Sequence, residues 1–194
     1  MTRTTPTAAE MVDRQALILE AVLALLARSG IAGVSMRAVA REARVALGLV
    51  NYYFEDKASL IAAALRRIEQ QDIAIVDPDP TLAPEERVRA ALRRVADPEF
   101  LTTEYLSLRL QLWALAQADE AFAHINTEAQ SRYRAELASL IRSARPTLTR
   151  AECNKRAADI DILQNGIWLT ALLGLDRASI HRNVTRSEEI ALAP

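Results

Sequence analysis

Three aromatic residues in a row, Tyr52, Tyr53 and Phe54, are the residues of this chain whose types and spacing most clearly suggest chemistry. Arg44 precedes them and Lys57 follows them. Successive residues on a helix point about 100° apart, so at most two of the three rings can face a core. Tyrosine carries an apolar ring and a polar tip, which suits a surface that touches both a sugar-phosphate backbone and base edges. The run therefore predicts contact with nucleic acid.

Neighbouring residues supply the other groups that a DNA reader needs. Ser35 at a helix N-terminus offers a hydroxyl and free N–H groups to a phosphate, and cationic side chains neutralise further phosphates. A glycine lets a helix approach the major groove closely, and side chains on that helix can reach base edges. The cations are Arg37, Arg44 and Lys57, the glycine is Gly48, and the base-directed side chains are Leu47, Asn51 and Tyr52. Composition and spacing alone leave an ordinary three-helix bundle with surface tyrosines as an equal alternative.

The segments that would position these residues read as helices. Apolar spacing predicts a helix over 11–28, ended by Ser29 and Gly30, with the first six residues as a disordered arm and a capping box at Thr7. Ser35 can cap a short helix over 36–43, and a third helix follows over 47–54. This order describes a helix-turn-helix with a supporting first helix. Asp56 is placed to cap a fourth helix over 57–75.

The rest of the chain also reads as helix after a proline-rich break at 76–84. The expected helices cover 85–96, 98–118, 120–145, 152–173 and a short stretch after Asp176. Leu106–Leu112 alternates with period two, but with no strand to pair with we predict helix there too. Thr149 and Glu152 form a capping box. We expect an all-α chain of about nine helices, with an N-terminal domain over 1–56 and a C-terminal domain over 57–194.

Composition excludes several classes of function. The net charge of −1 rules out binding nucleic acid over the whole surface but permits a local basic patch. Two histidines, one cysteine and five scattered glycines complete neither a metal site, a nucleophilic site nor a phosphate loop, so we expect no enzyme, no metal and no cofactor. The lone Cys153, the absence of an apolar leader and the absence of about 18 uninterrupted apolar residues predict a cytoplasmic protein without a membrane span.

The stretch from Ala43 to Leu60 resembles the recognition segment of TetR-type transcriptional repressors, roughly Ala-Gly-Val-Ser-x-Gly-x-x-x-x-Tyr-Phe-x-x-Lys-x-x-Leu. The matching residues here are Val45, Gly48, Tyr53, Phe54, Lys57 and Leu60. The resemblance implies that Tyr53 and Lys57 hold phosphates, that Tyr52 contacts a base or its methyl group, and that Phe54 belongs to the core.

Two positions depart from the family pattern. Arg44 stands where the family has the glycine of the turn, and Ala46 where it has a serine cap. Without a hydroxyl at Ala46 the third helix lacks one cap and one phosphate contact. Arg44 can supply a substitute charge.

Within the family the chain is most similar to BetI-like, choline-responsive regulators. This resemblance covers the run Gly48–Lys57, Trp113, and Gly166-Ile-Trp168-Leu. The residue before Gly166 is an acid in the choline-responsive proteins and Asn165 here. The lost carboxylate weakens the case for a quaternary ammonium ligand.

The C-terminal helices are expected to hold an effector and to form a dimer. Six residues could line an effector pocket, although aromatic residues at this spacing are more often plain core: Tyr105, Trp113, Phe122, Asp161, Asn165 and Trp168. In 157–173 apolar residues cover more than one face, which fits a dimer interface that includes Ile160, Ile167 and Leu172, or else a fully buried central helix. TetR-like proteins pair through their last two long helices.

These observations predict a dimeric repressor that binds a near-palindromic double-stranded DNA operator and is released by a small-molecule effector. The alternative is a helical small-molecule-binding or adapter protein without DNA recognition. The identity of the effector and the operator sequence are not encoded in these patterns.

Overall fold

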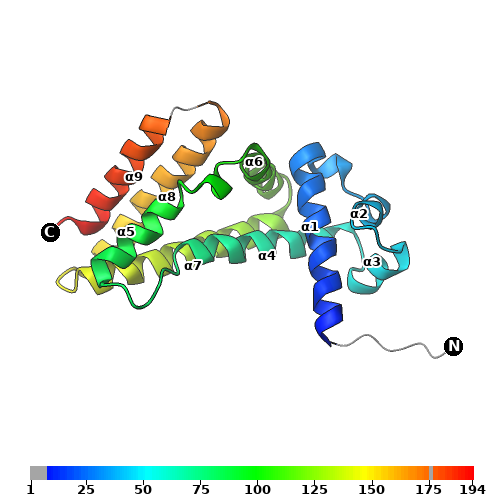
Figure 1. The fold of residues 1–194 in the computed structure, drawn as a ribbon, viewed down its shortest axis with the longest axis horizontal. Helices are drawn as coiled ribbons and strands as arrows, with labels where there is room; N and C mark the ends of the chain where they lie inside the picture. Colours follow the sequence, from blue (N-terminus) through cyan, green and yellow to red (C-terminus); the bar gives the residue numbers. More distant parts are fainter. Residues whose placement is uncertain (1–7, 175–176) are drawn as a thin grey trace. The chain divides into compact units, whose positions relative to one another are not determined.

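The computed structural model describes residues 8–174 and 177–194, and all regular structure in this part is helical (Figure 1). This confirms the all-α prediction. The elements are α1 (Ala8–Gly33), α2 (Met36–Glu42), α3 (Leu47–Tyr53), α4 (Lys57–Ile75), α5 (Pro84–Arg94), the 3₁₀ helix η1 (Pro98–Phe100), α6 (Thr103–Ala118), α7 (Glu120–Ala144), α8 (Arg150–Leu172) and α9 (Arg177–Leu192). The predicted arm and the capping box at Thr7 lie outside the described residues.

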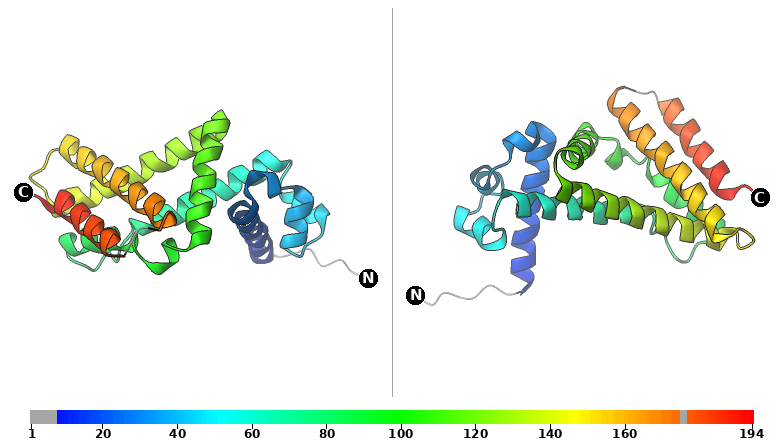
Figure 2. Two further views of the ribbon diagram at one scale, coloured as in Figure 1. Left: turned by 90° about the horizontal axis from the view of Figure 1, so that it is seen from above. Right: turned by 180° about the vertical axis from the view of Figure 1, so that it is seen from behind.

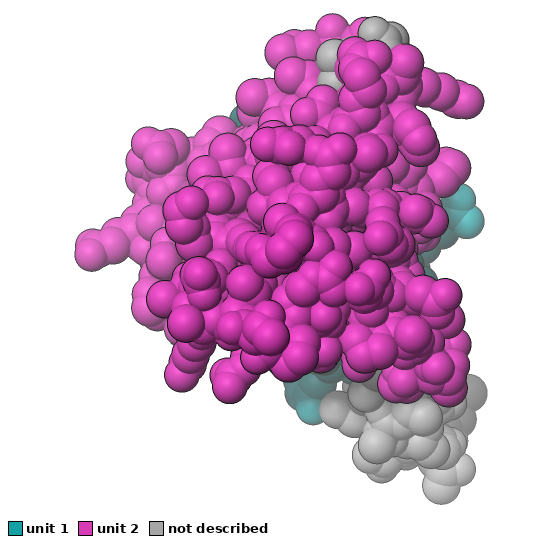
Figure 3. All heavy atoms as spheres, turned by 90° about the vertical axis from the view of Figure 1, so that its left-hand side faces the viewer, with its two compact units in different colours: residues 1–67 teal, residues 68–194 magenta. Residues whose placement is uncertain are grey.

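The chain forms two compact units, Met1–Arg67 and Ile68–Pro194 (Figure 3). The division falls inside α4, between residues 67 and 68, rather than between 56 and 57 as the sequence suggests. Asp56 caps α4 as predicted, because its Oδ1 accepts from the Ser59 N–H at 2.8 Å. The first turns of α4 supply Leu60, Ile61 and Ala64, which are essentially fully buried. The start of this helix is therefore part of the first hydrophobic core.

The first unit packs α1 against α2 and α2 against α3. Its core is made of aliphatic side chains from every helix and one aromatic ring: Ile18, Val22, Leu26, Val39, Val50, Phe54 and Leu60. Gly30 has φ +61° and bends the end of α1, which agrees with the predicted helix end at Ser29 and Gly30. Two short helices are thereby held on one longer one, in the order of a helix-turn-helix.

In the second unit α7 is the central helix, in contact with α5, α6 and α8, while α8 and α9 run alongside each other (Figure 2). Buried side chains of α5, α7, α8 and α9 form one core that includes Leu92, Leu137, Ile141 and Ile160. Glu188 of α9 accepts from Arg89 at 2.8 Å and from Arg93 at 2.7 Å, both on α5. These charge-assisted bonds fix α9 against α5.

One helix boundary was predicted wrongly. The stretch 98–118 is not one helix, because η1 ends at Phe100 and α6 begins only after Thr102. Thr102 has an extended backbone and its hydroxyl oxygen accepts from the Tyr105 N–H at 3.2 Å, which starts a new helix. Leu106–Leu112 lies inside α6, so the helix prediction for this alternating segment is confirmed.

Within the described residues, the segment Arg14–Gly33 is long and apolar enough to cross a membrane by length and composition alone, with a mean hydropathy of 1.8. Its residues Ile18, Val22 and Leu26 are completely buried in the first unit. Core helices of globular proteins satisfy the same criterion, so this segment is weak evidence for a membrane span.

Candidate nucleic-acid interface and ligand cavity

Ser35 begins α2 as the sequence predicts. Its Oγ accepts from the Ala38 N–H at 3.1 Å, and its backbone is extended, as an N-cap requires. The hydroxyl proton is still available to an external acceptor such as a phosphate oxygen. Arg37 lies exposed in the first turn of α2, while Val39 and Ala40 face the core. The exposed face of α2 thus carries a cation beside a helix N-terminus, an arrangement that suits an anion.

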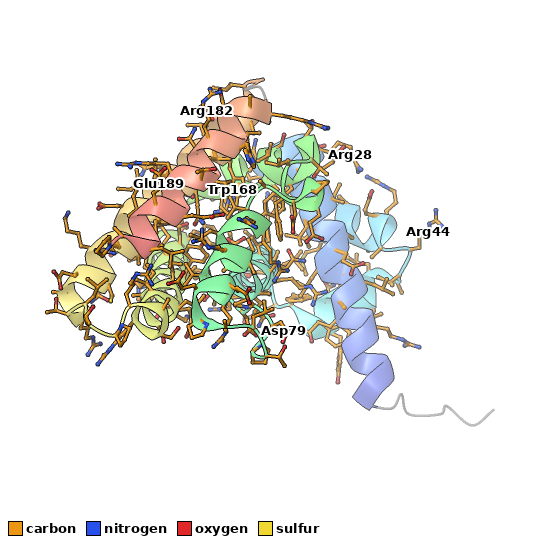
Figure 4. The ribbon with its side chains drawn as sticks, turned by 60° about the vertical axis from the view of Figure 1, so that its left-hand side comes forward. Arg28, Arg44, Asp79, Trp168, Arg182 and Glu189 are labelled. Carbon is orange, nitrogen blue, oxygen red and sulfur yellow. The ribbon has the colours of Figure 1, made fainter. Side chains whose placement is uncertain are left out.

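Arg44 lies in the turn between α2 and α3 (Figure 4). Its backbone is left-handed, with φ +55°. Val45 N–H donates to the Ala40 carbonyl at 2.9 Å and Arg44 N–H to the Arg41 carbonyl at 3.2 Å. This is the bonding of a Schellman motif, in which the left-handed position is usually glycine. The side chain of Arg44 is exposed. The chain therefore keeps a strained, cationic residue where an uncharged glycine would fit without strain.

We expect Arg44→Gly to stabilise the first unit by about 1 kcal/mol, because glycine adopts the left-handed conformation without a Cβ clash. If Arg44 contacts a phosphate, the same change should weaken binding to any DNA duplex. It should also reduce the slope of log affinity against log salt concentration (the salt slope) by about one. Thermal unfolding and salt-dependent DNA titration measure the two effects. Arg41→Ala is the matched control, since it removes an exposed cation from helical backbone and should give no gain in stability. A gain in both stability and DNA affinity with Arg44→Gly would contradict a phosphate contact.

Helix α3 starts without a side-chain cap. Ala46 takes the extended N-cap conformation but has no group to bond the free N–H donors of the first turn. Gly48 is exposed, and a Cβ built on it would meet nothing within 4 Å. The packing of the protein itself therefore gives no reason for a glycine in this helix, where it costs about 1 kcal/mol relative to alanine. Close approach of an external partner does give such a reason.

The three consecutive aromatic residues have three different environments. Phe54 is 5% exposed and belongs to the core, as the resemblance implied. Tyr53 is partly buried, 6.4 Å from Phe54 between ring centroids. Tyr52 is 70% exposed and packs edge-on against Tyr53 at 5.2 Å. With Asn51 also exposed, α3 presents an aromatic ring and an amide to solvent at its C-terminal end.

Lys57 has a role within the protein that the sequence did not indicate. Its Nζ donates to the Ile31 carbonyl oxygen at 2.7 Å, in the last turn of α1. The Ile31 carbonyl also accepts from the Val34 N–H at 3.2 Å, so the Lys57 ammonium is its second donor and complements the negative end of the helix dipole. The ammonium keeps two further donors. Lys57 thus links the start of α4 to the end of α1, and a phosphate contact would come in addition.

The second unit contains a cavity of about 50 Å³ lined by side chains of α4, α6, α7 and α8. Most of its lining residues have polar or charged side chains: Glu69, Asp72, Arg109, Asn126, Ala129, Gln130, Tyr133, Asp161, Asn165 and Trp168. Ligand sites in helical proteins also lie between helices and carry a few convergent polar groups.

Arg109 is the central cation of this cavity. Its Nη1 donates to Asp72 Oδ2 at 2.6 Å and to the Tyr105 hydroxyl at 3.2 Å, and that hydroxyl donates to Asp72 Oδ1 at 2.7 Å. Its guanidinium carbon lies 3.9 Å from the ring centroid of Trp168. Burial opposes the charge of Arg109, but the Asp72 carboxylate outweighs it and raises the pKa of the guanidinium. Burial and the negative charge of Asp72 together raise the pKa of Tyr105.

Two further carboxylates face the cavity. Glu69 is 5% exposed and its Oε1 lies 2.6 Å from Arg132 Nη2. Asp161 is 9% exposed, accepts from Asn165 Nδ2 at 3.0 Å and lies 3.5 Å from Arg134. Burial raises the pKa of the Asp161 carboxyl, although Arg134 and Asn165 act against the shift. A cation entering the cavity would favour the charged carboxylate and act against this shift.

The structure brings only part of the predicted effector residues to the cavity. Asp161, Asn165 and Trp168 line it, at successive turns of α8. Tyr105 and Trp113 do not line it, but both rings lie 5.8 Å from the Arg109 guanidinium. Phe122 is a buried residue of α7 outside the lining and is corrected to core. Glu69, Asp72 and Arg109 also line the cavity, and no sequence pattern indicated them because they are distant in sequence from α8.

The predicted interface residues need a correction. Ile160 and Ile167 are 0% and 2% exposed within the second unit itself, so they have no surface to offer a partner. Leu172 is partly buried. The exposed large apolar residues of α8 and its C-cap are Ile162, Leu169 and Leu173, which are spaced by seven and four residues, as on one face of a helix. No group of three or more metal-ligating side chains occurs among the described residues.

Two family models match this sequence. The model of the TetR family of bacterial regulatory proteins matches residues 18–64, and the model of the BetI-type transcriptional repressor C-terminal domain matches residues 84–189, more than half of the chain. The chain belongs to the TetR family. It is a DNA-binding transcriptional repressor with a BetI-type C-terminal domain, and members of this family are regulators rather than enzymes.

Relatives and solved structures agree with this membership in the TetR family. The HTH-type transcriptional regulator BetI of Paraburkholderia phymatum is 26% identical over 170 residues, with 84% of this chain and 83% of the relative covered. A transcriptional regulator from Pseudomonas aeruginosa PAO1 superimposes with a TM-score of 0.79 at 25% identity, covering 92% of this chain and 88% of that one. A Saccharomonospora viridis regulator, solved in complex with choline, superimposes with a TM-score of 0.70 at 20% identity. The match covers 92% of this chain and 95% of that one.

Proposed function

We propose that this TetR-family protein acts as a cytoplasmic homodimer that represses transcription from a near-palindromic operator and leaves it when a small molecule enters the α4/α6/α7/α8 cavity. The observation that carries the DNA part is α3. Its Tyr52 is 70% exposed, and its Gly48 has open space where a Cβ would stand. Most of the Tyr52 residue lies outside the core and the space at Gly48 is not filled by the protein itself, and both features suit a helix that enters the major groove.

The DNA contacts divide into two kinds. Leu47, Asn51 and Tyr52 on α3 would meet base edges. The exposure of Asn51 and Tyr52, beside a half-buried Leu47 on the same short helix, supports this role. Phosphates would be bound by the groups around them: Ser35, Arg37, Arg44, Tyr53 and Lys57. The N–H groups at Ala46 would act through the backbone alone, since alanine offers no hydroxyl.

A dimer would place two α3 helices on one DNA face, with centres about 34 Å or a multiple of it apart. The exposed apolar face of α8, formed by Ile162, Leu169 and Leu173, supports pairing through α8. An effector would act by favouring a dimer conformation in which the distance between the two α3 helices does not match successive major grooves. Its influence is limited to the difference between its affinities for the two states.

Leu169→Asp is expected to convert the dimer to a monomer, because it places two charges of the same sign in an apolar interface. Leu110→Asp is the matched control, since Leu110 is equally exposed at 42% but lies on α6. Sedimentation or light scattering of both variants measures the oligomeric state. If Leu169→Asp stays dimeric, or if both variants dissociate, this face of α8 is not the interface.

The function is tested by selecting binding sites from randomised duplex DNA at low salt. We expect an enriched near-palindrome whose half-sites are about one helical turn apart. Enrichment without any symmetry would contradict the dimer, and failure to bind DNA at low salt would contradict the proposed function as a whole.

A further inference from the structure

The cavity already contains a cation over its aromatic face. The Arg109 guanidinium lies 3.9 Å from the Trp168 ring centroid and 5.8 Å from those of Tyr105 and Trp113. It is also held by Asp72 at 2.6 Å. A trimethylammonium group binds mainly through contact with aromatic faces. To reach these rings it would have to displace Arg109 and leave the Asp72 carboxylate without its partner.

The carboxylates of Glu69 and Asp161 supply hydrogen-bond acceptors to this cavity, while Arg109 Nε is a buried donor without a partner among the described residues. Glu69 is 5% exposed, and its Oε1, although ion-paired with Arg132, has no hydrogen-bond partner among the described residues. Asp161 is also buried, with a distance of 3.5 Å to Arg134. Amides of Asn126 and Gln130 line the same wall. These carboxylate and amide oxygens need N–H donors, which a quaternary ammonium does not have.

We propose that the effector of this cavity is a small organic cation that carries N–H donors, such as a protonated primary amine, and not a quaternary ammonium. The inference rests on the proposed function. The cation lies between Glu69 of α4 and Asp161 of α8 and donates to their carboxylates. Arg109 stays on Trp168 and forms one wall of the site. The cavity volume of about 50 Å³ suits a small headgroup rather than a bulky ring system.

The test is a methylation series that keeps the rest of the ligand constant. Ethanolamine, its N-methyl and N,N-dimethyl derivatives, and choline are titrated into the full-length protein by calorimetry. Each methyl group removes one N–H donor, so affinity should fall along the series, with choline at least about tenfold weaker than ethanolamine. Equal or tighter binding of choline overturns the proposal, and so does the absence of measurable binding for all four compounds.

Two variants assign the effect to named groups. Asp161→Asn keeps the shape and removes one carboxylate, so ethanolamine should bind at least about tenfold more weakly while the melting temperature is retained or raised, because burial disfavours the charge. Arg109→Ala opens the aromatic face beside Asp72, so choline should now bind better than ethanolamine and raise the melting temperature of the variant. A preference for ethanolamine that Asp161→Asn leaves unchanged overturns the assignment.

Operator binding is measured in parallel. If the protein does not bind DNA, the proposed function fails whatever the order of the amines. If it binds DNA and choline is the preferred ligand, only the present inference fails.

Discussion

Arg109→Ala is expected to destabilise the second unit by about 3–5 kcal/mol, the usual cost of leaving one member of a buried ion pair without its partner. The Arg109 and Asp72 side chains are 12% and 20% exposed, and their charged atoms are 2.6 Å apart. Removing the guanidinium leaves the Asp72 carboxylate beside the Tyr105 hydroxyl without its counter-charge. Urea denaturation of the full chain measures the loss.

The double variant Arg109→Met with Asp72→Asn is the control. It removes both charges, and the asparagine oxygen still accepts from the Tyr105 hydroxyl. Because a matched uncharged pair leaves no buried ion, most of the lost stability should return. If the double variant is as unstable as Arg109→Ala, the packing of the arginine stem matters more than the ion pair.

Phe54→Ala is expected to destabilise the first unit by about 3–5 kcal/mol, because Phe54 is 5% exposed and its ring fills the core beneath α3. DNA binding should be lost with it, since α3 is only seven residues long and depends on this packing for its helical form. The cavity of the second unit should still bind its ligand. Calorimetry and DNA titration of the same sample measure both properties.

Tyr52→Ala provides the matched comparison, since it removes a neighbouring ring that is 70% exposed and should change stability by less than about 0.5 kcal/mol. If Phe54→Ala kept full DNA affinity, α3 would not be the element that contacts DNA.

Local features of the fold could be predicted from sequence because short-range bonds determine them. The caps at Ser35, Asp56 and Thr149 each use a side chain that bonds a backbone N–H three residues ahead. The break before α6 was missed because the helix was expected to start at Pro98, which placed Thr102 inside it. A cap inside an expected helix leaves a weak signal in the sequence.

The cavity could be predicted only in the part that comes from one helix. Asp161, Asn165 and Trp168 lie on one face of α8, which periodicity reveals. The acids of α4 and Arg109 of α6 join them only through tertiary packing. The same limit explains why the wrong residues were expected at the dimer interface. Ile160 and Ile167 form one apolar stripe of α8, and Ile162 and Leu169 form another. Spacing alone cannot tell which stripe is covered by the protein itself.

The central claim is that the exposed face of α3 reads DNA sequence. It is tested most directly by measuring the affinity of the selected operator and of a scrambled duplex, over a range of salt concentrations, for the wild type, Tyr52→Ala and Arg37→Ala. Arg37 is a better position than Lys57 for testing a phosphate contact, because Lys57 also donates to the Ile31 carbonyl within the protein. We predict that Tyr52→Ala reduces the preference for the operator about 10- to 100-fold and leaves the salt slope unchanged. Arg37→Ala should weaken both duplexes equally and lower the slope by about one. An unchanged operator preference in Tyr52→Ala would contradict the claim.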